Sequence, residues 1–255
     1  MIRAVLAAAI LWVGTLPGLA SERIVLGLSQ DEVAITATFD GSSLLIFGAV
    51  SREAPIPSDG RLEVIITVTG PLGPLDVRRK ERQFGIWVNA DSVWLSEAPS
   101  FYAVASTGPL KDILSPVEDL RHGITLGQVI NTVGARESVQ DVENFTAALR
   151  RIRESEGLYQ INEGSVALDQ QTLFRTSIEL PSNLVEGSYQ TRIFLLRNRD
   201  VVDIFTTGIP VRKVGMERWL YTTANTQPVL YGLMSLVIAI AAGWGASALF
   251  RLLQR

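Results

Sequence analysis

Side chains that enzymes use for catalysis or metal binding are scarce in this sequence. It has no cysteine and a single histidine, His122, which excludes thiol chemistry and any site built from several histidines. Glu118 and Asp119 lie one helical turn before His122, so a serine–histidine–aspartate arrangement is one interpretation. The other is structural, because His122 directly precedes Gly123, and a basic residue suits a helix C-terminus. We favour the structural role and predict no enzyme, no metal site and no cofactor, since P-loop, dinucleotide and nucleophile-elbow motifs are also absent.

Two tryptophans are the candidates for a ligand surface. Trp87 and Trp94 lie in strand-like stretches, where exposed rings offer flat platforms for a sugar. Alternation places Trp87 on the strand face opposite Ile86 and Val88. The alternative is that both rings lie in a β-sandwich core, where strand tryptophans are common. The neighbouring basic run RRKER, residues 78–82, suits either an anionic partner or a solvated strand edge that discourages aggregation.

A different pattern occurs near the C-terminal end, where every fourth residue is small: Ser235, Ala239, Gly243 and Ser247. Residues four apart stay near one side of an α-helix and drift by about 40° per step. Small side chains let a second helix approach closely, which is how membrane helices gain packing energy. The alternative is that such residues are simply common in membrane spans. We predict that this face packs against another integral membrane protein or a second copy of the chain.

The stripe lies in a segment long enough to cross a bilayer. Residues 229–250 carry no charge and would rise about 33 Å as a helix, against a hydrocarbon thickness of about 30 Å. The first 20 residues resemble a secretory signal peptide, with small residues at Gly18 and Ala20 before a cleavage site. An uncleaved anchor is the alternative. Both place the intervening region outside the cytoplasm and the C-terminus inside it.

The region between the apolar ends is mildly acidic. All 26 acidic residues lie between Glu22 and Glu217, together with 20 of the 23 basic ones. Binding surfaces for nucleic acid or anionic membrane usually need a net basic face. The charge therefore argues against both kinds of surface, and we expect no nucleic-acid partner.

Most of this region has the pattern of β-strands. Short runs rich in Val, Ile, Thr and aromatic residues alternate with turn residues, which predicts an immunoglobulin-like antiparallel β-sandwich of one or two units. Tyr189 is expected to hydrogen-bond back to the loop before its strand, as in such sandwiches. Within the first half we expect short strands at 75–79, 83–89 and 92–95, with a turn at 89–91.

A helical insert interrupts the strands. Ser115 suits a helix N-cap, Pro116 the first helical position and Gly123 the helix end. The expected order is a signal peptide (1–20), a β-rich region (21–107), the helical insert (108–160), a β-rich region that completes the sandwich (161–214), a juxtamembrane collar (215–228), the membrane helix (229–250) and a cytoplasmic tail (251–255).

The stretches LSQDEVAITATFDGSSLLIFGAV, FGIWVNADSVWL, LFRTSIELPSNLVEGSYQTRIFLLR and VGMERWLYTTANTQPVLYGLMSLVIAIAAGWGASALFR resemble a family of uncharacterised single-pass transmembrane proteins of alphaproteobacteria. The resemblance extends over most of residues 22–251. The resemblance implies an inner-membrane protein whose N-terminal domain faces the periplasm. It also implies a link to permeases of the sulfite or sulfonate exporter type, but no activity and no site residues.

Two functional hypotheses follow. The first is a membrane-anchored periplasmic protein-interaction or accessory subunit, in the setting of an inner-membrane transporter complex, which uses the small-residue face of its helix. The second is a binder of an envelope ligand, a glycan or a small anion, that uses Trp87 and Trp94 or the helical insert. A hydrolase that depends on His122 comes third.

Overall fold

The computed structural model describes most of the chain. The described residues are 22–29, 32–35, 39–52, 55–56, 60–130, 142–213, 220 and 223–253. The predicted signal peptide and its cleavage site lie outside this part, as does half of the predicted collar.

The chain is mainly β, as predicted. One sheet has four antiparallel strands in the order β1-β3-β10-β9. Along β10, exposed and buried residues alternate without exception, because successive side chains of a strand point to opposite faces. The strand bounds are β1 Glu22–Leu28, β3 Ser42–Arg52, β9 Ala167–Asp169 and β10 Leu173–Leu180.

A second, six-stranded sheet has the order β2-β12-β11-β4-β7-β8. Its central pairs are antiparallel, whereas the edge pairs β2–β12 and β7–β8 are parallel. The strand β8 lies at the end of the predicted helical insert and was not expected. The bounds are β2 Val33–Ile35, β4 Leu62–Thr69, β7 Tyr102–Ser106, β8 Tyr159–Asn162, β11 Gly187–Arg197 and β12 Asp200–Lys213.

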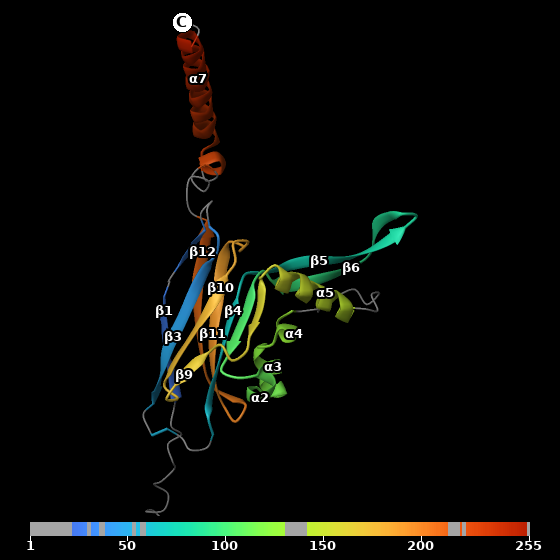
Figure 1. Ribbon diagram of the computed structural model, residues 1–255, viewed down its shortest axis with the longest axis vertical. Coiled ribbons are helices and arrows are strands. Elements are labelled where there is room, and N and C mark those ends of the chain that lie inside the picture. Colours follow the sequence, from blue (N-terminus) through green and yellow to red (C-terminus); the bar gives the residue numbers. More distant parts are fainter. Residues whose placement is uncertain are drawn as a thin grey trace, which may run out of the picture.

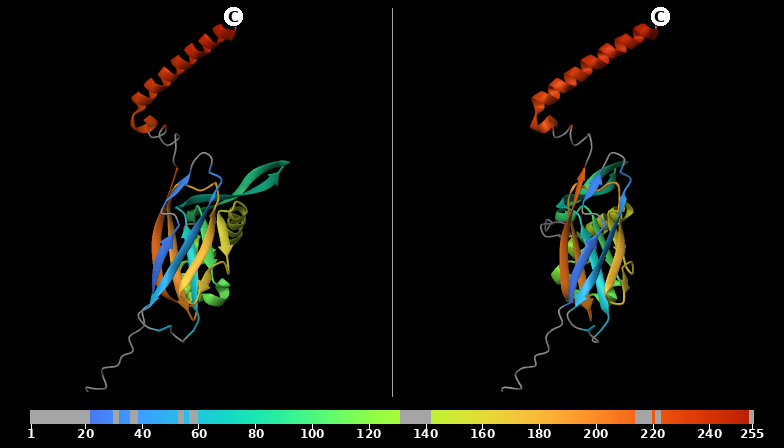
Figure 2. Two further views of the ribbon diagram at one scale, coloured as in Figure 1. Left: turned by 60° about the vertical axis from the view of Figure 1, so that its left-hand side comes forward. Right: turned by 90° about the vertical axis from the view of Figure 1, so that its left-hand side faces the viewer.

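The two sheets lie face to face as one sandwich (Figure 2). Their buried residues form a single hydrophobic cluster, which corresponds to one unit rather than two. The strand orders match the two layers of an immunoglobulin-like fold, including a split first strand that joins both sheets. The Tyr189 hydroxyl donates to the carbonyl oxygen of Val185 at 2.9 Å, which confirms the predicted bond to the preceding loop.

The helices of the insert lie beside the six-stranded sheet, and α5 packs against its edge strand β8 (Figure 1). The Ser115 side chain accepts a bond from the Glu118 N–H at 3.3 Å, and Gly123 ends the helix with φ of 57°, both as predicted. Arg192 of β11 donates to the carbonyls of His122 and Gly123 at 2.7 and 2.9 Å, and burial lowers its pKa. The sheet thus holds the helix by its C-terminal end. The bounds are α2 Leu110–Ile113, α3 Pro116–His122, α4 Leu126–Val129 and α5 Val142–Ser155.

The strands β5 (Leu72–Gln83) and β6 (Ile86–Pro99) form a separate hairpin that projects from the sandwich (Figure 1). The prediction of three short strands here was wrong. The turn is at Phe84–Gly85, and the expected turn at 89–91 is a β-bulge, where Arg79 pairs with Asp91 but Lys80 pairs with Asn89. The sequence Asn-Ala-Asp is typical of a turn. The same residue types also suit a β-bulge, because the strand must depart from regular geometry to hold one extra residue.

The last described element is the helix α7, Pro228–Leu253. Its stretch Pro228–Ser247 has a mean hydropathy of 1.9 and none of it is buried within the chain. Twenty helical residues rise about 30 Å, the thickness of the hydrocarbon layer. α7 therefore has the length, composition and exposure of the membrane span predicted from the sequence.

Candidate functional site

The predicted small residues lie on one side of α7. At 100° per residue, Ala239, Gly243 and Ser247 fall within about 80° of one another. A methyl group added at Gly243 would meet no atom within 4 Å, so the fold of this chain does not itself require a glycine there. Ser235 lies at the edge of this face, and its hydroxyl donates to the carbonyl of Tyr231 at 2.9 Å within the helix.

A further glycine, which the sequence pattern did not single out, lies on this side of α7. Gly232 lies eleven residues before Gly243, close to three full turns, and it too has open space around its Cα. Leu236 separates it from the other small residues on the same side. Gly245 is also open but lies on the opposite side of the helix, about 200° from Gly243. The bare surface therefore runs from residue 239 to 247, and we call it the small-residue face.

Both candidate tryptophans are exposed, Trp87 by 68% and Trp94 by 51%. They are not core residues, because the hairpin carries them away from the sandwich. The seven-residue spacing would put them on opposite faces, but the bulge adds one residue between them and restores a common face. Trp87 pairs with Arg82 and Trp94 with Asp76, so they lie about 20 Å apart at 3.3 Å per residue. That separation is too large for one sugar ring to contact both.

The basic run 78–82 is divided between the two faces of the hairpin. Alternation places Arg78, Lys80 and Arg82 on the face with the tryptophans. Arg79 points to the other face, where it pairs with Asp91 and lies over the ring of Phe145 of α5, 5.4 Å from its centre. The exposed face of the hairpin therefore combines two indole rings with three basic residues, one of which, Arg78, is paired with Asp76 on the same face at 2.8 Å.

The turn of the hairpin is strained. Phe84 and Gly85 both have positive φ, 49° and 89°, as two-residue type I′ turns require. Glycine adopts this conformation freely, but a bulky L-residue costs about 1–2 kcal/mol in it. Phe84 is fully exposed, so no contact within the chain offsets the strain. Such an outlier points to a function outside the fold.

The insert helices border a cleft of about 680 Å³, a size suited to a small molecule. Its acidic groups already hold the surrounding chain: Asp119 accepts from the Thr125 N–H at 2.7 Å and Glu163 from the Leu110 N–H at 3.0 Å. Two basic groups are engaged as well: Arg199 donates to the Leu114 carbonyl at 3.0 Å, and Arg150 Nε lies 3.5 Å from a carboxylate oxygen of Glu154. The charged lining residues are Lys111, Asp119, Arg150, Glu163 and Arg199.

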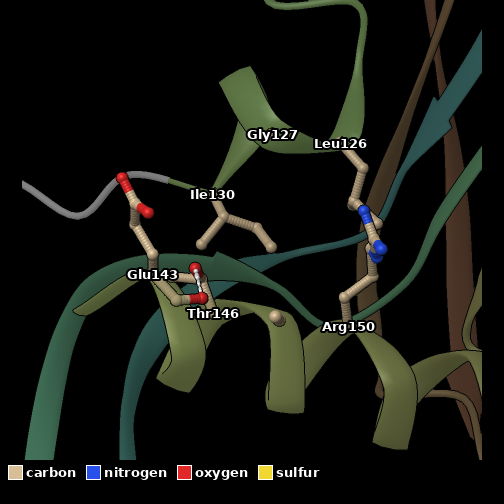
Figure 3. A pocket seen from close by; sticks show the side chains of 7 residues that line it. Leu126, Gly127, Ile130, Glu143, Thr146 and Arg150 are labelled. Carbon is tan, nitrogen blue, oxygen red and sulfur yellow. Dashed lines mark hydrogen bonds between the residues drawn. The ribbon is translucent and has the colours of Figure 1, made fainter. Parts of the chain in front are cut away.

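A smaller pocket of about 270 Å³ adjoins the cleft between α4 and α5. Figure 3 shows Ile130 on one side of it and Glu143, Thr146 and Arg150 of α5 on the other. The Thr146 hydroxyl donates to the Glu143 carbonyl at 2.9 Å. Residues 131–141, between Ile130 and α5 in the sequence, lie outside the described part, so we assign no site to this pocket.

His122 has structural contacts. Its Nε2 lies 3.3 Å from a carboxylate oxygen of Glu118, and its ring packs beside Phe194 with centres 5.8 Å apart. These contacts fix the imidazole between the helix α3 and the sheet, in the position predicted for a helix-terminal basic residue. Within the described ranges no three His, Asp or Glu side chains gather as a metal site would require.

A family model described as "Putative transmembrane protein (Alph_Pro_TM)" matches residues 23–252. The chain belongs to this transmembrane family. The match confirms the resemblance seen in the sequence and extends over the sandwich, the hairpin and α7. A comparison with curated proteins finds no match.

Membership in a transmembrane family fits the surfaces described above. In the described chain, α7 is the helix long and apolar enough to span a bilayer. The small-residue face lies within this span, whereas the exposed aromatic and basic residues of the hairpin lie outside it. The candidate span and the hairpin thus carry two distinct exposed surfaces, and each calls for its own explanation.

Proposed function

We propose that this protein is a membrane-anchored accessory subunit. Its sandwich lies on the periplasmic side of the inner membrane, α7 crosses the bilayer, and the small-residue face of α7 packs against a helix of another integral membrane protein. The signal-like N-terminus supports this orientation, and the family resemblance suggests a transporter as the setting.

The observation that carries the proposal is the glycine at residue 243. A glycine within a helix costs about 1 kcal/mol relative to alanine, and space for a methyl group is available at Gly243. A neighbouring helix that approaches closely would need that space and would offset the cost through packing. The same helix face carries Ala239 and Ser247, which extend the close approach over two turns.

The test is affinity purification of tagged full-length protein from gently solubilised membranes, with identification of the proteins that co-purify. We expect Gly243→Leu to reduce the recovered partner about tenfold, corresponding to a loss of about 1.4 kcal/mol. Gly245→Leu is the matched control, because it makes the same change on the opposite side of α7 and should retain the partner. Differently tagged copies of the chain detect self-association in the same experiment.

Two results would count against the proposal. If wild-type protein retains neither a partner nor a second copy, α7 is only a tether. If both leucine variants lose the partner equally, the effect reflects general disturbance of the helix rather than a specific face.

A second candidate function is favoured by the cleft beside the insert helices. Its excess of basic groups suits a small anion, so the protein would also act as an envelope ligand binder. Sulfite, sulfate or phosphate should then raise the melting temperature of the wild type, and Arg150→Ala should abolish the rise. Arg151→Ala, the neighbouring exposed arginine that does not line the cleft, should keep it. No shift with any anion in the wild type would rule out this function for these ligands.

A further inference from the structure

The β5–β6 hairpin extends well beyond the sandwich that supports it. Its outermost cross-strand pair with a buried member is Val77 with Val93. Residues 78–83 of β5 continue beyond this pair to the turn, a free length of about 20 Å at 3.3 Å per residue. Every residue from 78 to 92 is exposed except the half-buried Val88. Near the base of this outer part, Arg79 lies over the Phe145 ring of α5. A two-stranded ribbon with little packing is only marginally stable in water, so the residues beyond Arg79 should gain from a contact.

The end of the hairpin is apolar, and basic residues lie directly behind it. We call residues 82–87 the hairpin tip. Phe84 is fully exposed, and Ile86 and Trp87 are about two-thirds exposed. Lys80 and Arg82 follow on the tryptophan side. Aromatic rings beside lysine or arginine are the combination found where proteins contact the boundary between lipid headgroups and acyl chains.

The hairpin leaves the sandwich at the end nearest the membrane helix. Pro71, just before β5, packs against Gly187, where any Cβ atom would collide with the proline ring. Gly187 pairs with Val211, two residues before β12 ends at Lys213. Figures 1 and 2 show this arrangement, with the hairpin and the C-terminal end of β12 at the same end of the sandwich. The hairpin is thus on the side of the sandwich that faces the bilayer when α7 is inserted.

The chain between the sandwich and α7 is long enough for contact. Fourteen residues separate Lys213 from Pro228. Residues 223–226 are helical, so this segment spans at most about 40 Å. The free part of the hairpin covers about 20 Å by the strand rise given above. A modest tilt of the sandwich on its tether brings the hairpin tip to the lipid surface.

We propose that the hairpin tip is a second membrane contact of this protein. Phe84, Ile86 and Trp87 enter the interface of the leaflet that faces the sandwich, while Lys80 and Arg82 bind the phosphates of anionic lipids. The proposal rests on the span by α7 but not on a protein partner for it. The two contacts together hold the sandwich in one orientation above the bilayer.

The charge of the hairpin differs from that of the region between the apolar ends taken as a whole. The exported region as a whole is acidic, which argued against binding to an anionic membrane. From Asp76 to Asp91, however, there are four basic residues and three acidic ones. Arg78 and Arg79 pair with Asp76 and Asp91, and nearer the tip Lys80 and Arg82 outnumber Glu81. Electrostatic attraction to a charged surface falls off within about 8–10 Å at physiological salt. The charge of the hairpin therefore governs the contact, and that of the distant sandwich does not.

The test uses the full chain reconstituted in lipid vesicles. Because the protein has no cysteine, single cysteines can carry an environment-sensitive fluorophore, and a nitroxide-labelled lipid serves as quencher. Ile86→Cys probes the hairpin tip. Val202→Cys, an exposed strand residue near the β11–β12 turn at the other end of the sandwich, is the control outside the membrane. Ile238→Cys on α7 reports the span itself.

In vesicles that contain phosphatidylglycerol, we expect the emission of the label at residue 86 to shift to the blue and to be quenched by the nitroxide lipid. The label at residue 238 should behave in the same way, and the label at residue 202 should not. Lys80→Glu combined with Arg82→Glu should abolish quenching at 86 and leave 238 unchanged. Phe84→Asn should weaken quenching at 86 without lowering the melting temperature, because Asn-Gly suits a type I′ turn. This last variant separates lost contact from lost folding.

Other outcomes would overturn the proposal. If the label at 86 is unquenched like the label at 202, while the label at 238 is quenched, then α7 spans the bilayer but the hairpin does not touch lipid. Quenching at 86 that is equal in pure phosphatidylcholine and insensitive to the charge reversal removes the role of the anionic lipid. An unquenched label at 238 would instead show that α7 does not span, which contradicts the proposed anchoring as well.

Discussion

Replacing Glu22 by alanine is expected to lower the free energy of unfolding by about 3–5 kcal/mol, the cost of breaking a buried ion pair by removing one partner. One carboxylate oxygen of Glu22 accepts from Arg52 Nε at 2.6 Å and from Arg197 Nη2 at 2.9 Å. All three side chains are less than one-tenth exposed. Alanine would leave two guanidinium groups buried without an anion. Arg197 would keep its bond to the Gly60 carbonyl and Arg52 its bond to the Thr172 hydroxyl, but both acceptors are neutral.

Urea unfolding of the full chain in detergent, followed by circular dichroism in the β-sheet region, measures this effect. Glu179→Ala is the matched control, because Glu179 is an exposed glutamate in a strand of the same sheet. Its change should stay within about 0.5 kcal/mol. Equal midpoints for Glu22→Ala and Glu179→Ala would show that the triad of Glu22, Arg52 and Arg197 does not stabilise the sandwich.

The second large effect is expected at Gly48, where β3 has no room for a side chain. A Cβ atom there would lie 2.5 Å from the ring of Phe174 and 2.6 Å from the carbonyl oxygen of Val25. Gly48→Ala should therefore destabilise the sandwich by about 1–3 kcal/mol, as overpacking of a core does. Gly73→Ala, at a position with nothing within 4 Å, is the control and should change little.

A double variant identifies the cause. Phe174→Leu alone should destabilise through lost packing, but combined with Gly48→Ala it should recover part of the loss, because the smaller side chain leaves room for the methyl group. Residues in contact are expected to show this non-additivity. Strictly additive losses would mean that the collision with the Val25 carbonyl, rather than with Phe174, dominates.

Local signals predicted much of the fold. The alternation along β10, the caps of α3 at Ser115 and Gly123, and the bond from Tyr189 to the preceding loop all depend on residues close together in the sequence. α7 was predicted for the same reason, since its length and composition suffice. The β5–β6 turn was missed because phenylalanine at positive φ is not a turn signal.

Long-range features could not be predicted from one sequence. The parallel edge strand β8 depends on its partner β7, more than 50 residues earlier, and the pairing of Glu22 with Arg197 joins residues 175 apart. The candidate site shows the same division. Ala239, Gly243 and Ser247 share a face through helical geometry alone, whereas Trp87 and Trp94 share one only because a bulge lies between them.

The central claim is that the two sides of α7 differ, one facing another protein and the other facing lipid. Site-specific photo-crosslinking in native membranes tests it most directly, with the photoreactive residue at Ala239 or Ala241. These positions hold the same residue type in the same span but lie about 200° apart around the helix. We predict a discrete protein adduct from position 239 and none from position 241. Equal adducts from both positions, or none from either, would contradict the claim.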